Sequence, residues 1–371
     1  MITLREVEDR DLVPLSEFLP GGFHSTTKKF WLELFDFWWI KNPAWTPQIP
    51  RGWVLDNGTN LVGFIGNIPV TFQIRGKPQI AVASNSWYVD PSIRGIYSFR
   101  LLNEFMKQPY ASLFLFKSNY ENLTKILFKY HFKEYILPRN QTEYVYIINK
   151  STIKFNFIKF VFHDKIPRLQ TVPELCGRLG FLLFSSVFQK PLVNTGDLPA
   201  DEYQTSLCTS CDDAFSTISN PNLRHCEATI SRDVTTLNWL YFSSSRFNKR
   251  MVIQCRRSKD ASLAGYMVFD ILRDKHSRLG IMELVDMCIE DNNPRVLEKL
   301  TLFAIETGRL NEASLLVVWG DSREAVTYFQ HAFTLRRSVQ NYRYVKVSDS
   351  PEMNTGKSSL NVCLPLLYPP Q

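Results

Sequence analysis

The sequence predicts an α/β protein, with helices packed on mixed β-sheets, in which one domain occurs twice. Strand-like and helix-like segments follow each other in the same mixed order in both halves of the chain. Short landmarks of the first half also recur in the second half at nearly constant spacing. With 371 residues, the chain exceeds the size of one ordinary hydrophobic core, so two domains are expected.

Four landmarks define the repeat. LVGFIGNIPV contains Gly63, and LAGYMVFDIL contains Gly265, which follows 202 positions later. SNSWYVD ends at Asp90 and ELVDMCIED at Asp291, and the pairs SLFLFKSN/SLLVVWGD and YHF/HAF keep a spacing of 202 and 201. Four landmarks in one order at one spacing indicate a duplication. The sequence therefore predicts domains at 1–143 and 203–347, joined by an insert at 144–202 and followed by a tail at 348–371.

Each half is predicted to contain two helices, three antiparallel strands, a helix, a buried strand and a last helix. Alternating apolar residues and turn sequences such as DNGTN and RGKP predict the positions of the strands. Apolar residues three and four positions apart predict the positions of the helices. Thr26 or Thr27 is expected to cap the second helix. In the first half the segments are 8–18, 26–40, 52–55, 61–72, 80–89, 96–107, 112–117 and 121–130. In the second half they are 212–219, 234–241, 251–256, 263–273, 280–289, 294–308, 314–319 and 322–332.

Composition restricts the partners and the compartment. Apolar residues make up 44% and charged residues 21%, as in a globular protein, and the net charge of +7 favours an anionic ligand. No Lys/Arg run is present, so no specific nucleic acid is expected. The seven cysteines form no disulfide framework and the first residues form no signal peptide, which together favour the cytoplasm. Cys208 and Cys211 lack a second pair, so no metal is predicted.

One apolar segment, at 172–193, has two interpretations. Its uncharged run is about half the length that spans a bilayer. It is either a helix packed at the domain junction or an interfacial helix that places the protein at the membrane periphery.

The loop after the third long strand carries a family resemblance. SNSWYVDPSIRGIYSFRLL holds Val89, Pro91, Arg94 and Gly95 in the register of the pattern V-x-P-x-x-R/Q-G-x-G-x-G/A, and the segment ends in Leu-Leu. It resembles the pyrophosphate loop of GNAT acyltransferases, and the chain as a whole resembles bacterial tandem-GNAT proteins. Tyr97 and Phe99 depart from the pattern, because Gly or Ala is usual at both positions.

The resemblance implies two tandem GNAT folds with acyl-CoA, such as acetyl-CoA, as the co-substrate. Free backbone N–H groups at a helix start bind phosphate oxygens, and the donor-binding residues it implies are Tyr88, Val89, Arg94, Gly95, Ile96, Tyr97, Ser98 and Asn119. In the family the thioester lies where the fourth and fifth strands splay, and a backbone N–H of the fourth strand, here that of Tyr88 or Val89, polarises its carbonyl. Asn85 and Tyr88 are candidate catalytic residues beside it.

The second copy keeps a different part of the pattern. Its loop, EDNNPRVLEKL, contains no glycine, which predicts degenerate CoA binding. The helix Tyr that acts as an acid in the family pattern is matched by Tyr328, five residues before Phe333, whereas the first copy has Leu127 there.

The resemblance therefore implies an acyltransferase in which an amine or hydroxyl of a small-molecule acceptor attacks the thioester directly. A glycan or a lipid-linked precursor is compatible with the aromatic composition of the chain, in which Phe, Trp and Tyr make up 13%. The alternatives are an aminoacyl-tRNA-dependent transferase, and a GNAT-like scaffold without catalysis.

Overall fold

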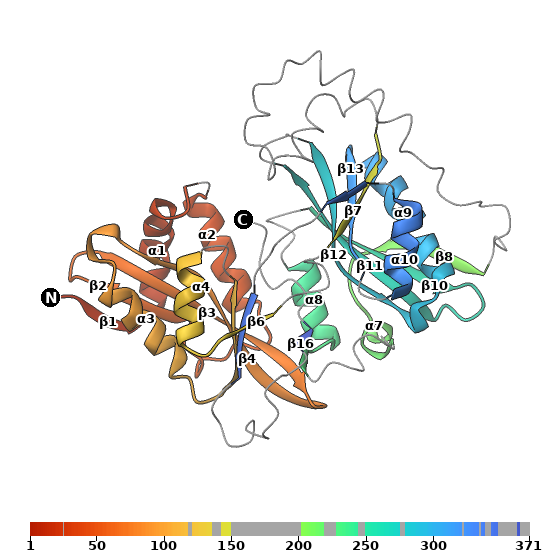
Figure 1. Cartoon of the computed structure of the whole chain (residues 1–371). Coiled ribbons are helices and arrows are strands. Elements are labelled where there is room, and N and C mark those ends of the chain that lie inside the picture. Colours follow the sequence, from red (N-terminus) through yellow and green to blue (C-terminus); the bar gives the residue numbers. More distant parts are fainter. Residues whose placement is uncertain are drawn as a thin grey trace, which may run out of the picture. The chain divides into compact units, whose positions relative to one another are not determined.

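The computed structural model describes two compact units, each built around one mixed sheet (Figure 1). The residues it describes are 1–24, 26–117, 121–135, 142–149, 202–218, 228–243, 249–274, 279–320, 323–333, 335–337, 343–347 and 362–363. Unit 1 comprises Met1–Ile136, Cys226–Phe247 and Asn341–Gln371. Unit 2 comprises Leu137–His225 and Asn248–Gln340.

The unit 1 sheet runs in the order β1-β2-β3-β4-β5-β15-β6. Its strands are β1 (Thr3–Glu6), β2 (Gly52–Asp56), β3 (Leu61–Ile74), β4 (Lys77–Val89), β5 (Ala111–Lys117), β6 (Lys133–Tyr135) and β15 (Arg343–Val347). β1 to β4 are successively antiparallel, and β4 and β5 are parallel. Two short strands, β9 (Ala228–Ile230) and β16 (Val362–Cys363), pair with each other, and β9 also pairs antiparallel with the end of β3.

Helices cover both faces of this sheet because its strands are apolar on both sides. α3 (Ile96–Met106) and α4 (Glu121–Lys129) share one hydrophobic core with Trp53, Val82 and Val89. α1 (Leu12–Phe18) and α2 (Lys28–Phe35) pack on the opposite face, where the Phe35 ring lies 6.5 Å from that of Phe64 (Figure 1). Thr27 caps α2 by accepting the Phe30 N–H, which confirms the second of the two expected caps.

A π-helical turn, η3 (Asp36–Ile40), continues α2 and buries Trp38 and Trp39 completely. Trp39 Nε1 donates to the carbonyl of Asn67 on β3. α8 (Val234–Phe242) packs on this turn: the Trp239 ring stacks on Phe37 at 5.1 Å and its Nε1 donates to the Phe37 carbonyl at 2.8 Å. The predicted single helix at 26–40 is therefore an α-helix with a π-helical end.

The unit 2 sheet repeats the same plan, in the order β14-β7-β13-β12-β11-β10-β8. Its strands are β7 (Glu143–Ile147), β8 (Tyr203–Cys208), β10 (Lys249–Arg257), β11 (Leu263–Arg273), β12 (Gly280–Ile289), β13 (Leu315–Val318) and β14 (Leu335–Arg337). The helices among its described residues are α7 (Asp213–Thr217), α9 (Pro294–Leu310) and α10 (Arg323–Ala332). Apart from β9 and β16, the two sheets have the same strand order, which confirms the predicted duplication of a mixed α/β domain.

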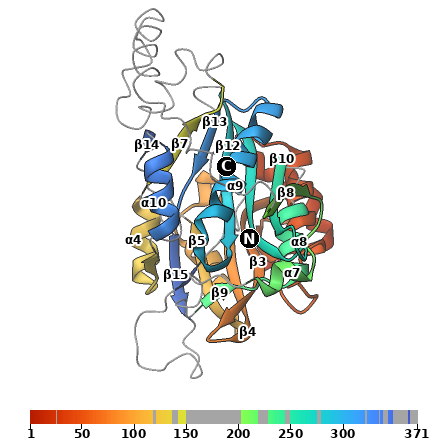
Figure 2. The ribbon, with the colours of Figure 1, turned by 90° about the vertical axis from the view of Figure 1, so that its right-hand side faces the viewer.

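The two halves of the chain exchange one strand each. β7 follows the elements of unit 1 in the chain, yet it pairs with β13 and β14 of unit 2 (Figure 2). β15 follows the elements of unit 2, yet it pairs with β5 and β6 of unit 1. Each unit thus needs a strand from the other end of the chain, and β7 lies at the start of the predicted insert.

None of the helices in the described ranges is long and apolar enough to cross a membrane. The apolar segment at 172–193 lies outside the described residues.

Candidate active site

An opening between β4 and β5 forms the centre of the candidate site in unit 1. The two parallel strands pair from Ile80–Ala111 to Ala83–Leu115, where the ladder ends. Beyond this point β4 continues to Val89 on β3 alone, while β5 continues on β15. The backbone of β4 from Ser84 onward therefore has an edge that β5 leaves unpaired.

A β-bulge marks the start of that edge. The register of β3 and β4 shifts between Phe64 and Gly66, and Ser86 takes a φ of 55°, which is unusual for a residue other than glycine. Ser86 Oγ donates to Asn85 Oδ1 at 3.0 Å, so the two side chains lie together at the bulge. Bulges of this kind turn a strand and redirect its side chains.

Alternation along β4 decides which backbone groups face the opening. The Asp90 N–H bonds to the Val62 carbonyl at 2.9 Å, so Asp90 forms a hydrogen-bonded pair with β3. Tyr88, two residues earlier, points its backbone to β3 in the same way, and Val89 points its N–H and carbonyl to the other edge. The Val89 carbonyl indeed accepts the Arg94 Nε–H at 3.0 Å.

The loop after β4 presents a row of backbone donors. Asp90 caps the short turn η4 (Pro91–Ile93) by accepting the N–H and Oγ–H of Ser92, and these bonds hold the pKa of its carboxyl below the usual range. Gly95 follows with φ 97°, a left-handed conformation that favours glycine, and α3 begins at Ile96. Within the described residues, the N–H groups of 94–97 have no acceptor.

The predicted donor-binding residues thus come together in one strand–loop–helix segment, with one exception. Arg94, Gly95 and Ile96 are exposed at the loop, while Tyr97 packs against the core under α3. The Arg100 guanidinium lies 5.5 Å from the Tyr97 ring. Asn119 lies outside the described residues.

The Tyr88 side chain leaves β4 on the face covered by α1 and α2. Its ring lies 5.1 Å from Phe18 and 6.1 Å from Phe23, and the Arg94 guanidinium lies 5.8 Å from it. Gly22 makes this contact possible, because a Cβ at Gly22 would lie 2.4 Å from Tyr88 Cδ2. This contact was not predicted, since the Gly-Gly sequence indicates a turn but not what packs on it.

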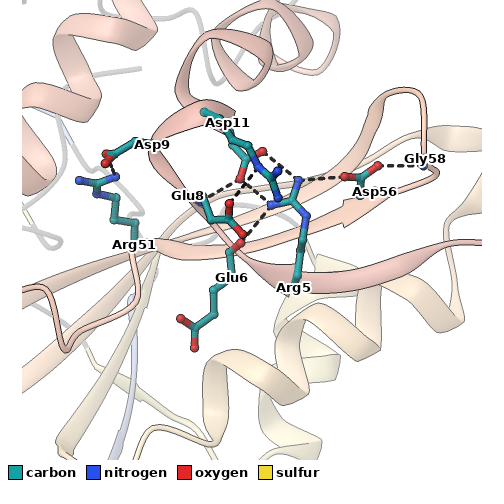
Figure 3. Close-up of polar contacts among 9 residues, drawn as sticks. Arg5, Glu6, Glu8, Asp9, Asp11, Arg51, Asp56 and Gly58 are labelled. Carbon is teal, nitrogen blue, oxygen red and sulfur yellow. Dashed lines mark hydrogen bonds and ion pairs between the residues drawn. The ribbon is translucent and has the colours of Figure 1, made fainter.

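A second feature missed by the sequence analysis is an open depression of about 670 Å³ between α1 and the β2–β3 turn. Its floor is an ion-pair network in which Arg5 donates to Asp11 at 2.6 and 2.8 Å and to Asp56 at 2.8 Å (Figure 3). Burial raises the pKa of Asp11, but the bonds from Arg5 and from the Glu8 N–H outweigh it and leave the pKa lowered. Phe18 lines this depression and also packs on Tyr88.

The corresponding loop of unit 2 bonds several of its donors internally. β12 and β13 also part, after Glu283–Val317, but α9 begins with Pro294, which has no N–H. The Arg295 N–H bonds to Asn293 Oδ1 at 3.0 Å, and its guanidinium pairs with Glu202 at 3.2 Å. Arg257 pairs with Glu290 at the same loop.

Tyr328 lies on α10 of unit 2, so it belongs to a different unit from the loop at 90–95. Its ring packs at 5.5 Å from Phe329, and its hydroxyl oxygen is buried. Burial, and then the carboxylate of Glu298, raise the pKa of the phenol, so the group stays protonated at neutral pH.

No cluster of three or more His, Cys, Asp or Glu side chains that could hold a metal occurs in the described part of the chain. Cys208 and Cys211 form no disulfide, and burial raises the pKa of Cys208 to about 11.

Comparison with known proteins identifies the fold. No family model matches the sequence, and no curated protein matches it by sequence search. The structure is similar to that of a conserved protein of unknown function from Enterococcus faecalis V583, which is described as a probable N-acyltransferase. The TM-score is 0.57 and the sequence identity is 10%, and the match covers 94% of this chain and 73% of that one. It is also similar to Saccharomyces cerevisiae N-myristoyltransferase with bound myristoyl-CoA, with a TM-score of 0.53 and 12% identity over 93% and 82%.

A third match is a tandem GNAT protein from the clavulanic acid biosynthesis pathway, with a TM-score of 0.54 and 10% identity over 94% of this chain and 99% of that one. This match spans both units and nearly the whole of the other chain. The chain therefore has the tandem GNAT fold that the loop at Asp90–Leu102 predicted.

Proposed function

We propose that unit 1 is an acyltransferase that binds an acyl-CoA donor in the opening between β4 and β5. The observation that carries this proposal is that the opening between the two strands and the loop with free donors lie next to each other on β4. The ladder between β4 and β5 ends at Ala83, and the same strand leads directly into a loop with four unbonded N–H groups and Arg94. Backbone donors at a helix start, next to a cation, suit a pyrophosphate.

The proposed reaction is direct transfer. The nucleophilic nitrogen or oxygen of the acceptor forms a bond to the thioester carbon and loses its proton, the carbon–sulfur bond breaks, and the leaving thiolate takes up a proton. The Val89 N–H, which faces the open edge of β4, is the candidate donor to the carbonyl oxygen, since the Tyr88 N–H faces β3. Asn85 and Tyr88 are proposed to line the same opening.

The acceptor is proposed to enter on the face of α1 and α2. Tyr88 connects that face to the opening, because its ring lies between Gly22 of the α1–α2 loop and Arg94 of the donor loop. The role of Tyr328 as the acid for the thiolate stays a prediction, because this residue belongs to unit 2 whereas the proposed donor site belongs to unit 1. Unit 2 is proposed not to bind the donor, because its loop donors are already used.

Calorimetric titration with acetyl-, octanoyl- and myristoyl-CoA tests the proposal, and the duplication supplies a matched control. Arg94→Glu in unit 1 is expected to weaken binding by about thirtyfold or more, because a charge-assisted contact becomes repulsive. Arg295→Glu, at the equivalent position of unit 2, is expected to leave binding unchanged. Absence of binding by the wild type, or an equal loss in both variants, would contradict the proposal.

A further inference from the structure

The surface around the donor loop is both cationic and apolar. Ile96 is 72% exposed, Phe99 39% and Phe128 47%, although helices normally turn such side chains inward. Exposed cations lie on the same loop and the two helices that follow it: Arg94, Arg100, Lys107, Lys125 and Lys129. We call these eight residues the α3/α4 face.

The two helices form one continuous surface. α3 and α4 lie on the same side of the sheet, and Tyr130 Oη, directly after α4, donates to Asn103 Oδ1 on α3 at 2.7 Å (Figure 1). Acidic residues are few here: the helices contain Glu104, which pairs with Lys107 at 2.6 Å, and Glu121. The α3/α4 face is therefore complementary to an acidic partner with an apolar contact of its own.

We propose that this face docks an acidic carrier protein that delivers the acyl group on a phosphopantetheine arm. The inference rests on the proposed function, and it names the source of the thioester. The arm is linked to its carrier by a single phosphate and has no adenosine. The exposed Phe99 side chain fits that difference, because it stands where the CoA-binding pattern has a small residue.

The position of the α3/α4 face favours a carrier protein as the partner rather than a flat membrane surface. The exposed apolar side chains Ile96 and Phe99 belong to the first turn of α3, directly after the loop with the free N–H groups. A partner seated here brings its phosphate to that loop, and the arm then extends along β4 into the opening. The cations around this point would speed association and make it sensitive to salt.

The test measures binding of a fluorescent octanoyl-loaded acyl carrier protein of type II fatty-acid synthesis by anisotropy, in parallel with octanoyl-CoA by calorimetry. The affinity for the carrier is expected to fall about tenfold between about 50 and 300 mM NaCl. Arg100→Glu and Phe99→Ser are each expected to raise the Kd for the carrier about tenfold. For octanoyl-CoA, Arg100→Glu is expected to change the Kd less than about twofold, and Phe99→Ser is expected to leave it unchanged or to lower it, because Ser restores a small residue at this position. Arg10→Glu, an exposed cation next to α1 on the other face of the sheet, is the matched control and is expected to change neither.

The outcomes separate the two proposals. If octanoyl-CoA binds and the carrier does not, or if Arg100→Glu leaves carrier binding intact, the docking inference is wrong and the acyl-CoA site stands. If neither ligand binds, the proposed function itself fails. If vesicles of phosphatidylglycerol bind in place of the carrier, and Arg100→Glu abolishes that binding, the face serves an anionic membrane and the carrier is excluded.

Discussion

The contact between Gly22 and Tyr88 links the α1–α2 loop to the proposed donor site, and two adjacent glycines test it. In Gly22→Ala the new Cβ would lie 2.4 Å from Cδ2 and 2.6 Å from Cγ and Cε2 of Tyr88. Carbon atoms normally approach to about 3.5 Å, so the ring or the loop must move by about 1 Å. Overpacking of this kind costs about 1–3 kcal/mol of unfolding free energy.

Gly21→Ala provides the comparison within the same turn. Its Cβ would lie 3.7 Å from Tyr88 Oη, an ordinary contact. Neither glycine has a positive φ, so backbone strain does not enter either case. We expect Gly21→Ala to be neutral or to stabilise the protein by up to about 1 kcal/mol, because the unfolded chain loses freedom.

Urea unfolding of both variants, and of each in a Tyr88→Ala background, measures the contact. The cost of Gly22→Ala should fall below about 0.5 kcal/mol once the ring is removed. Gly22→Ala should also weaken acyl-CoA binding, because the displaced ring presses on Arg94. Equal stability of Gly21→Ala and Gly22→Ala, or an unchanged cost without the ring, would refute the reasoning.

Three further predictions concern the framework. Trp239→Phe keeps the stacking on Phe37 but removes the indole N–H that donates to the Phe37 carbonyl. Urea unfolding should therefore show a fall of about 1–3 kcal/mol in the free energy of unfolding. A fall below about 0.5 kcal/mol would mean that this bond does not hold α8 in place. Asp11 has a lowered pKa in the folded protein, so its stabilising effect is complete above about pH 4 and is lost as the pH falls through that lowered pKa. Asp11→Asn should flatten the fall of the melting temperature in this acidic range, and an unchanged slope would contradict the assignment. Deletion of 341–371 removes β15, so hydrogen exchange should rise first in β5 and β6, and protection equal to that of the full chain would contradict the strand exchange.

Much of the fold could be predicted because the long elements carry strong local patterns. β11 and β12 have the limits expected from their alternating residues, and the duplication follows from landmarks such as Gly63 and Gly265. The short strands β7 and β15 were not predicted. Five residues with alternating side chains can specify a strand. The local pattern does not decide which of the two sheets that strand joins, because both sheets have an apolar strand with which it could pair.

The site was predictable only where one segment contains it. Arg94 and Gly95 follow from the loop motif, because the function of such a loop depends on consecutive residues. The packing of Tyr88 on Gly22 joins positions far apart in the sequence, and no local pattern encodes it. The same is true of the Arg5 network, in which Asp11 and Asp56 come from different elements.

Amide hydrogen exchange with and without a non-hydrolysable acyl-CoA tests most directly whether unit 1 holds the donor. We predict that binding protects the amides of Val89 and of 94–97, while those of the equivalent segment 290–298 in unit 2 stay unchanged. Protection confined to 290–298, or binding that leaves Val89 and the loop of unit 1 unprotected, would contradict the assignment of the donor site.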